Sequence, residues 1–278
     1  MQSLALGTAQ WGTSYGVTNA QGRLTDAVVG SIIAAARAAG ITELDTAGAY
    51  GDAEARLRPW AGEFAVTTKV LGADPASIPR QLAASLGHLG VDRVQSCLLH
   101  DWSILDAGQA AQAVQELRRL QESGMVEIVG VSAYDEPDIE RAIEAFETLD
   151  ALQVPANVLD QRLAESSILV DLAERGARIQ VRSVFLQGLL ATRSSTLLGL
   201  HPAVARFHDW CEARGRDPRE VSLAFARSLP WVTSVVVGVT SGEELAQVAA
   251  AWIGGGADPG FATLATDDTA LIDPRSWA

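Results

Sequence analysis

The sequence predicts an α/β fold of the (β/α)8, or TIM, barrel class. Short apolar runs alternate with amphipathic stretches along the chain, which is the pattern of repeated strand–helix units around a parallel sheet. Eight such pairs can be counted. The length of 278 residues also fits, because α/β barrels of about 250 residues commonly form one domain. We therefore expect residues 1–278 to form a single barrel domain.

Eight strand candidates would form the barrel wall. Most are nearly continuous in β-forming residues, as expected for strands covered on both faces, and the first, second and sixth show the weakest pattern. In chain order they are Leu4–Thr8, Thr42–Asp45, Phe64–Lys69, Val94–Leu99, Glu127–Ser132, Ala151–Val154, Ile179–Val184 and Val232–Val237.

The stretches between these strands each carry one apolar stripe. Apolar residues recur at three- and four-residue spacing from Val28 to Ala36 and from Leu245 to Trp252, which places them on one face of a helix. Asp217-Pro218-Arg219-Glu220 has the cap, proline and glutamate that begin a helix. Because Val204–Arg214 is already amphipathic, we expect an extra helix between the seventh and eighth strands. The turn-rich tail, residues 257–278, is expected to fold back over one barrel face.

Composition excludes several classes of protein. The formal net charge of −13, without clustered Lys and Arg, argues against a nucleic-acid partner. An anionic dinucleotide would also need local donors to overcome this charge. The first residues lack a signal-peptide pattern and no stretch is long and apolar enough for a membrane span, so the expected compartment is the cytoplasm.

The cysteines and histidines give no metal-binding pattern. Cys97 and Cys211 are expected to be buried small hydrophobic residues. His201 and His208 lie seven residues apart without a third ligand, so we expect surface or capping roles for both and no metal site.

Active sites of these barrels lie at the carboxyl ends of the strands, so the polar residues that close the apolar runs are the candidates. Asp45, Lys69 and His100 close the second, third and fourth runs, and Tyr50 lies in the loop after Asp45. A cation beside Tyr50 would favour its phenolate and lower its pKa, which would make it a usable proton donor, and Lys69 is that cation. Asp45 would keep Lys69 charged, and a neutral His100 would orient a substrate carbonyl.

Three segments that carry these residues resemble motifs of the aldo-keto reductases: Leu44–Glu54, Thr67-Thr68-Lys69 and Leu98-Leu99-His100-Asp101. The likeness extends from Leu6 to about Gln247. It implies a nicotinamide cofactor, NADP or NAD, bound across the barrel face, and reversible reduction of a small-molecule carbonyl substrate. It also implies hydride transfer to the carbonyl carbon with Tyr50 supplying the proton.

The resemblance also assigns cofactor residues. Ser132 and Gln153 would bind the nicotinamide carboxamide, although Ala133 replaces the usual asparagine. Arg182 replaces the usual stacking aromatic, and its planar guanidinium could stack or pair with a carboxylate in the barrel mouth. The pyrophosphate segment would include Ser183, Leu186 and Gly188, and the adenosine segment would include Gly238, Thr240, Ser241 and Glu244.

The adenosine segment leaves the choice of cofactor open. Glu244 stands where the family typically has a basic residue for the 2′-phosphate. A carboxylate repels that phosphate and accepts a hydrogen bond from a ribose 2′-hydroxyl, which favours NAD. Thr240, Ser241 and amides at a helix N-terminus can still bind a phosphate, so NADP stays open.

Two rival functions stay open. Ala133, Glu244 and Val248 are compatible with a redox-neutral lyase or isomerase that uses the Tyr–Lys pair for proton transfer. The second rival is a noncatalytic binding subunit on the same scaffold, which the intact set of Asp45, Tyr50, Lys69 and His100 disfavours. Trp11 and Trp102 follow the first and fourth strands and either wall the substrate pocket or pack in the core.

Overall fold

Eight parallel strands close into a barrel in chain order, and β8 pairs with β1 to complete it. The computed structural model describes residues 2–193, 199, 201–254, 256 and 258–276. The predicted (β/α)8 barrel is therefore confirmed. The strands are β1 Ser3–Gly7, β2 Glu43–Asp45, β3 Ala65–Val70, β4 Val94–Leu99, β5 Val126–Ser132, β6 Ala151–Pro155, β7 Arg178–Arg182 and β8 Ser234–Gly238.

Each predicted strand overlaps an observed one, and β4 has the predicted bounds. The prediction for the seventh strand was wrong at its end. It extended to Val184, whereas β7 ends at Arg182 because Ser183 adopts a left-handed backbone with φ of 62°. An extended strand cannot continue through that conformation. The eighth strand begins at Ser234, two residues later than predicted.

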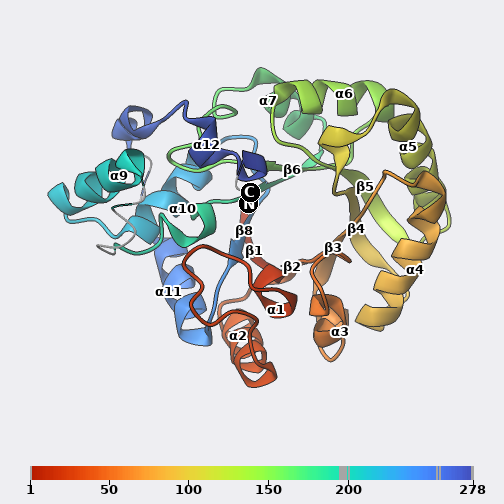
Figure 1. The fold of residues 1–278 in the computed structure, drawn as a ribbon, viewed down its shortest axis with the longest axis horizontal. Helices are drawn as coiled ribbons and strands as arrows, with labels where there is room; N and C mark the ends of the chain where they lie inside the picture. The colour runs from red at the N-terminus through yellow and green to blue at the C-terminus, as the bar shows by residue number, and fades with distance from the viewer. Residues whose placement is uncertain (1, 194–198, 200, 255, 257, 277–278) are drawn as a thin grey trace.

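Helices surround the barrel wall in Figure 1. Both α9 and α10 lie between β7 and β8, so the expected extra helix is confirmed, and Asp217 caps α10 by accepting from Arg219 N and Glu220 N. The α-helices with given bounds are α1 Ala9–Gly12, α2 Asp26–Ala38, α3 Ala53–Leu57, α4 Ile78–Leu89, α5 Ala107–Glu122, α6 Glu136–Phe146, α7 Ser167–Glu174, α9 Pro202–Ala213, α10 Pro218–Ser228, α11 Gly242–Ile253 and α12 Thr269–Ile272.

Trp11, Trp102 and the two cysteines are all core residues. Trp11 and Trp102 are completely buried, and Trp102 Nε1 donates to Asp138 O over 2.9 Å. They therefore pack in the core and do not wall the pocket. Cys97 and Cys211 are buried as predicted, and burial raises the pKa of each thiol to about 12.

The two α9 histidine predictions have different outcomes. The ring of His201 accepts from Ala203 N and caps the helix, as predicted. The surface or capping role predicted for His208 is wrong, because this residue is buried with Nε2 2.8 Å from Leu189 O. The helix turns His208 inward toward the chain that follows β7.

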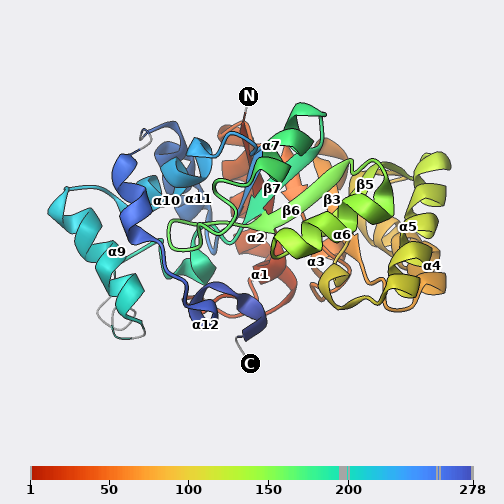
Figure 2. The ribbon, with the colours of Figure 1, turned by 90° about the horizontal axis from the view of Figure 1, so that it is seen from above.

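The segment after α11 folds over the face that carries the carboxyl ends of the strands. It contains η5 Pro259–Leu264, α12 and η6 Pro274–Ser276. Arg275 Nη2 lies 3.3 Å from Asp135 Oδ2, in the loop after β5. Figure 2 shows α12 on the side of the barrel opposite the start of β1. The predicted fold-back is confirmed for this segment, whereas Gly255, Ala257, Trp277 and Ala278 lie outside the described residues.

Over the described ranges, no helix is both long enough and apolar enough to cross a membrane.

Candidate active site

Adjacent strands bring the four catalytic candidates together. Asp45 ends β2, Lys69 lies near the end of β3, His100 follows β4 directly, and Tyr50 belongs to the loop between β2 and α3. Lys69 Nζ lies 2.7 and 2.8 Å from the two carboxylate oxygens of Asp45 and 3.4 Å from Tyr50 Oη. The rings of Tyr50 and His100 meet edge to face at 5.7 Å between centroids.

The Lys69–Asp45 ion pair is buried and fully hydrogen-bonded. Their side chains are 1% and 5% exposed. Lys69 Nζ also donates to Thr46 O over 3.0 Å, so the ammonium has backbone, carboxylate and phenol partners. A buried ion pair repays its desolvation only when such additional hydrogen bonds are made. The pair therefore holds a fixed positive charge beside the Tyr50 hydroxyl.

Gln153 supports this ion pair. Its Nε2 donates to Asp45 Oδ1 over 2.7 Å and to Gln180 Oε1 over 3.2 Å. Both amide hydrogens are then used within the protein, and only the amide oxygen is left for a ligand. The role expected from the family likeness, binding the nicotinamide carboxamide, is thus restricted to accepting hydrogen bonds through the amide oxygen. Gln180 was missed from the sequence, although a polar residue in the middle of the apolar seventh run was a signal that could have found it.

Among the four catalytic candidates, which we call the tetrad, the pKa shift differs from the expectation at Tyr50. Burial opposes charge on Lys69, but the ion pair with Asp45 outweighs it and raises the pKa of the ammonium. Burial raises the pKa of Tyr50, and the nearby Lys69 only reduces this rise. The predicted lowering of the Tyr50 pKa is therefore wrong in its net direction, because desolvation of the phenolate exceeds the attraction of the ammonium.

His100 has the protonation state that the sequence indicated. Burial, followed by the positive charges of Lys69 and Arg182, lowers the pKa of its imidazole to about 3. The ring is neutral at physiological pH, so it can donate a hydrogen bond to a carbonyl oxygen without competing as an acid.

Asp45, Tyr50 and His100 line a cavity of about 440 Å³ in the barrel mouth. A second hollow of about 540 Å³ adjoins it, and the two share lining residues such as Thr18, Gly188 and Thr240. The candidate cofactor residues that line the first cavity are Gln153, Arg182, Ser183, Gly188, Gly238, Thr240 and Glu244. Ser241 lines the second, whereas Ser132 and Leu186 are buried and line neither.

The chain after β7 forms a tight, left-handed turn at the junction of the two hollows. Ser183, Leu186 and Gln187 have φ values of 62°, 45° and 54°, a conformation that costs free energy for residues with a Cβ. At Gly188, φ is 94° and a Cβ would lie 1.8 Å from Thr18 Oγ1. This position therefore requires glycine. Such concentrated strain is typical of ligand-binding loops.

The second hollow carries charges of both signs. Glu244 Oε2 accepts from Thr240 N over 2.6 Å and from Thr240 Oγ1 over 2.8 Å, and Ser241 Oγ caps Glu244 N at 3.0 Å. Arg219 on α10 lines the same hollow and donates through Nη2 to Thr192 Oγ1, while its Nε is buried without an acceptor. From the sequence, Arg219 was expected only in a helix start, because its place in the hollow depends on α10 packing beside α11.

These residues fit an extended dinucleotide. The two adjoining hollows form one elongated depression, and the N-terminus of α11, which favours an anion, lies at the second of them. Arg219 also lines the second hollow and brings a positive charge to it, and its buried Nε has no acceptor among the described residues. In contrast, the described part of the chain contains no cluster of three or more His, Cys, Asp or Glu side chains placed to bind a metal ion.

Arg182 contacts a tyrosine that was not singled out from the sequence. Its guanidinium lies 4.3 Å from the centroid of the Tyr134 ring, and Nη2 donates to Ala133 O over 3.1 Å. Within the described ranges it forms no ion pair, so the alternative of a carboxylate partner in the barrel mouth is wrong. Tyr134 lines the cavity two residues after Ser132, and it follows the strand end in an ordinary loop that gave no signal.

A buried ammonium, a tyrosine and a neutral histidine at the mouth of a (β/α)8 barrel define an enzyme that can pass a proton to a substrate oxygen. The aldo/keto reductase family model matches residues 3–253, and the chain belongs to this family. Membership makes it an oxidoreductase of small carbonyl compounds that uses a nicotinamide cofactor, which favours this function over the redox-neutral and noncatalytic alternatives.

The relatives agree with this assignment. An aldo-keto reductase of Mycolicibacterium vanbaalenii is 30% identical over 75% of this chain and 72% of its own length. An NADH-specific methylglyoxal reductase of Escherichia coli is 32% identical, but over only 42% of this chain and 35% of its own length.

Solved structures show the same barrel. A putative aldo-keto reductase from Pseudomonas aeruginosa superposes with a TM-score of 0.69 at 25% identity, covering 90% of this chain and 88% of that one. A glycerol dehydrogenase from Gluconobacter oxydans has a TM-score of 0.72 at 22% identity over 98% of this chain and 92% of its own, a likeness of fold alone.

Proposed function

We propose that the protein reduces an aldehyde, ketone or sugar to the alcohol with NADH, and that Tyr50 is the proton donor. The observation that carries the proposal is the contact of Lys69 Nζ with both Asp45 and Tyr50 beside a neutral His100. When bound, the reduced nicotinamide supplies a hydride to the carbonyl carbon. The remaining chemistry is the work of the protein side chains.

Negative charge develops on the carbonyl oxygen as its carbon is reduced, so the oxygen needs donors that are already in place. His100 donates a hydrogen bond to that oxygen and orients it. Tyr50 Oη gives up its proton to the same oxygen, forming the alcohol and leaving a phenolate. Lys69 stabilises the phenolate through the 3.4 Å contact, and Asp45 holds Lys69 in its charged form.

The preference for NADH is supported by Glu244. Its carboxylate accepts hydrogen bonds from the Thr240 amide and hydroxyl, two donors that a 2′-phosphate would otherwise use. It also adds a negative charge beside them. A ribose 2′-hydroxyl can donate to such a carboxylate, whereas a phosphate is repelled. Ser183, Gly188, Gly238 and Ser241 would line the remaining path of the dinucleotide, and Gln153 would offer its amide oxygen to the carboxamide.

The first test is the Tyr50→Phe variant, assayed by NADH oxidation with a panel of aldehydes, ketones and sugars. Loss of the proton donor should reduce kcat by about 10²–10⁴-fold, the usual contribution of a general acid. NADH affinity, measured by fluorescence titration, should stay near the wild-type value and thus show that the variant is folded. Full turnover by Tyr50→Phe across the panel would contradict the proposed role.

A further inference from the structure

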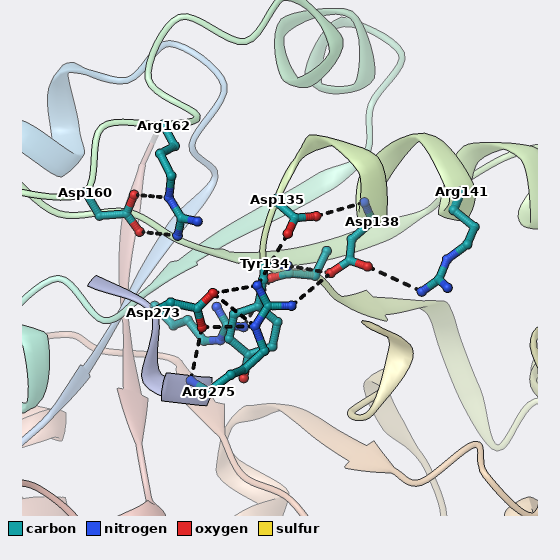
Figure 3. Close-up of polar contacts among 10 residues, drawn as sticks. Tyr134, Asp135, Asp138, Arg141, Asp160, Arg162, Asp273 and Arg275 are labelled. Carbon is teal, nitrogen blue, oxygen red and sulfur yellow. Dashed lines mark hydrogen bonds and ion pairs between the residues drawn. The ribbon is translucent and has the colours of Figure 1, made fainter. Parts of the chain in front are cut away.

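Two arginines contact the Tyr134 ring, and they differ in whether a carboxylate pairs with the guanidinium. Arg182 lies at 4.3 Å and Arg275 at 4.2 Å from the ring centroid. Arg275 is paired with Asp273 at 2.5 Å and with Asp135 at 3.3 Å, as Figure 3 shows for the carboxylates around it. Among the residues that the structure describes, Arg182 has only the neutral Ala133 O as an acceptor. The positive charge of Arg275 is balanced, and that of Arg182 is not.

Arg182 is half-buried, and part of its guanidinium has lost contact with water without gaining a partner. Among the described residues, its buried Nη1 has no hydrogen-bond acceptor. A buried cation is unfavourable unless an anion or several acceptors compensate for the lost water. In a chain with 34 acidic and 21 basic residues, carboxylates are abundant, yet within the described ranges none lies within ion-pair distance of this guanidinium.

The cation faces the reaction centre. Arg182 lines the same cavity as Tyr50 and His100, and its charge contributes to the lowered pKa of His100. The other cation that acts on His100, Lys69, is already neutralised by Asp45. The cavity therefore contains a guanidinium that is held by Tyr134 and lacks a counter-ion among the described residues.

We propose that the substrates of this enzyme are carbonyl compounds that carry a carboxylate, and that Arg182 binds the carboxylate while Tyr50 and His100 engage the carbonyl oxygen. This inference rests on the proposed function. A planar guanidinium matches a carboxylate in shape and charge, and its contact with Tyr134 fixes its orientation before the substrate arrives. Binding through a group remote from the carbonyl would also place the reacting atoms.

The test compares two substrates that differ in charge, para-carboxybenzaldehyde and its methyl ester. Their kcat/KM values would be measured in the wild type, Arg182→Gln and Arg182→Lys. The wild type should prefer the carboxylate by about tenfold or more, equivalent to about 1.4 kcal/mol. The preference should vanish in Arg182→Gln and survive in part in Arg182→Lys. Arg80→Gln, which removes an exposed guanidinium on α4 outside both hollows, should keep the wild-type preference.

A second measurement separates this inference from the proposed reaction. Calorimetric titration of the protein with benzoate and benzamide needs no turnover, and Arg182→Gln should weaken benzoate binding about tenfold while leaving benzamide unaffected. The titration decides the role of Arg182 even if neither aldehyde is reduced, whereas the proposed reaction is decided by the wider panel of aldehydes, ketones and sugars. A wild-type preference for the ester, or a carboxylate preference unchanged in Arg182→Gln, overturns the inference. So does a loss of NADH affinity without loss of substrate discrimination, which would assign Arg182 to the cofactor.

Discussion

The proton-transfer end and the adenosine end of the active site are built in contrasting ways. Asp45 and Lys69 lie on neighbouring strands, are buried, and form an ion pair that also contacts Tyr50. Thr240 and Glu244 lie in a loop and the first turn of α11, are half-buried, and bond mainly to one another. The first arrangement depends on the closed barrel, whereas the second is local to one connection.

This difference explains where the chain keeps the family pattern and where it departs from it. A change at Lys69 would leave a buried carboxylate unpaired, so the proton-transfer end tolerates little variation. A change at Glu244 alters a hydrogen bond at a helix N-terminus that faces solvent and the ligand. Cofactor choice can therefore vary while the chemistry at the carbonyl is retained.

The largest expected effect in this comparison belongs to Lys69→Met. Removing the ammonium leaves Asp45 buried without its partner, which should lower the free energy of unfolding by about 3–5 kcal/mol. Because the Tyr50 phenolate also loses its stabilising charge, kcat should fall by about 10²–10⁴-fold. Urea unfolding and NADH oxidation measure the two effects.

The double variant Asp45→Asn/Lys69→Met separates stability from catalysis. With both charges removed, most of the unfolding free energy should return, because no buried charge is left unpaired. The activity should not return. Recovery of turnover in the double variant would show that the Lys69 charge does not act on Tyr50.

An intermediate effect is expected for Glu244→Gln at the adenosine end. The amide keeps an acceptor for Thr240 but removes the negative charge, so the ratio of NADPH to NADH affinity should rise by about tenfold, or about 1.4 kcal/mol. Fluorescence titration with both dinucleotides measures this ratio, and the melting temperature should change little.

A variant of Arg219 gives an independent test of the proposed preference for NADH over NADPH. Arg219→Gln should weaken both dinucleotides to a similar extent, about twofold to fivefold, because it would remove a partly exposed charge interaction. A selective loss of NADPH binding, together with tighter NADPH than NADH binding in the wild type, would overturn the proposed preference for NADH.

The smallest expected effect is that of pH on carbonyl reduction. The reaction needs a protonated Tyr50, whose pKa is raised above 10.0, and a neutral His100, whose pKa is about 3. Since Tyr50 loses its proton only above its pKa and His100 gains one only near 3, kcat/KM should be flat from about pH 5 to pH 9. An acidic limb with a midpoint near 6.5 would show that His100 titrates at the ordinary histidine value.

The strands and the convergence of the tetrad were predictable because both follow from local patterns. Apolar runs that end in Asp45, Lys69 and His100 indicate buried parallel strands, and the barrel rule places such strand ends together. The neutral state of His100 was also foreseeable, since a histidine at a buried strand end beside a lysine disfavours a second positive charge.

Other parts of the site were not predictable. The sign of the Tyr50 pKa shift depends on a balance between burial and the Lys69 charge, which only the packed structure determines. The end of β7 was misplaced because Val184 continues an apolar run that the left-handed Ser183 interrupts. Gln153, assigned to the cofactor by likeness, also donates its two amide hydrogens to Asp45 across the barrel and to Gln180 on the neighbouring strand, contacts that the sequence did not indicate.

By itself, the sequence determined the (β/α)8 barrel and the four candidate catalytic residues that meet at its mouth, because hydrophobic periodicity and strand-end position are properties of short segments. Only the tertiary structure decided which charges are neutralised. Asp45 balances Lys69 and Asp273 balances Arg275, whereas Arg182 is left with the Tyr134 ring and the Ala133 carbonyl. Ion pairing depends on distances between segments far apart in the chain, and those distances arise only when the barrel closes and the C-terminal segment folds over it.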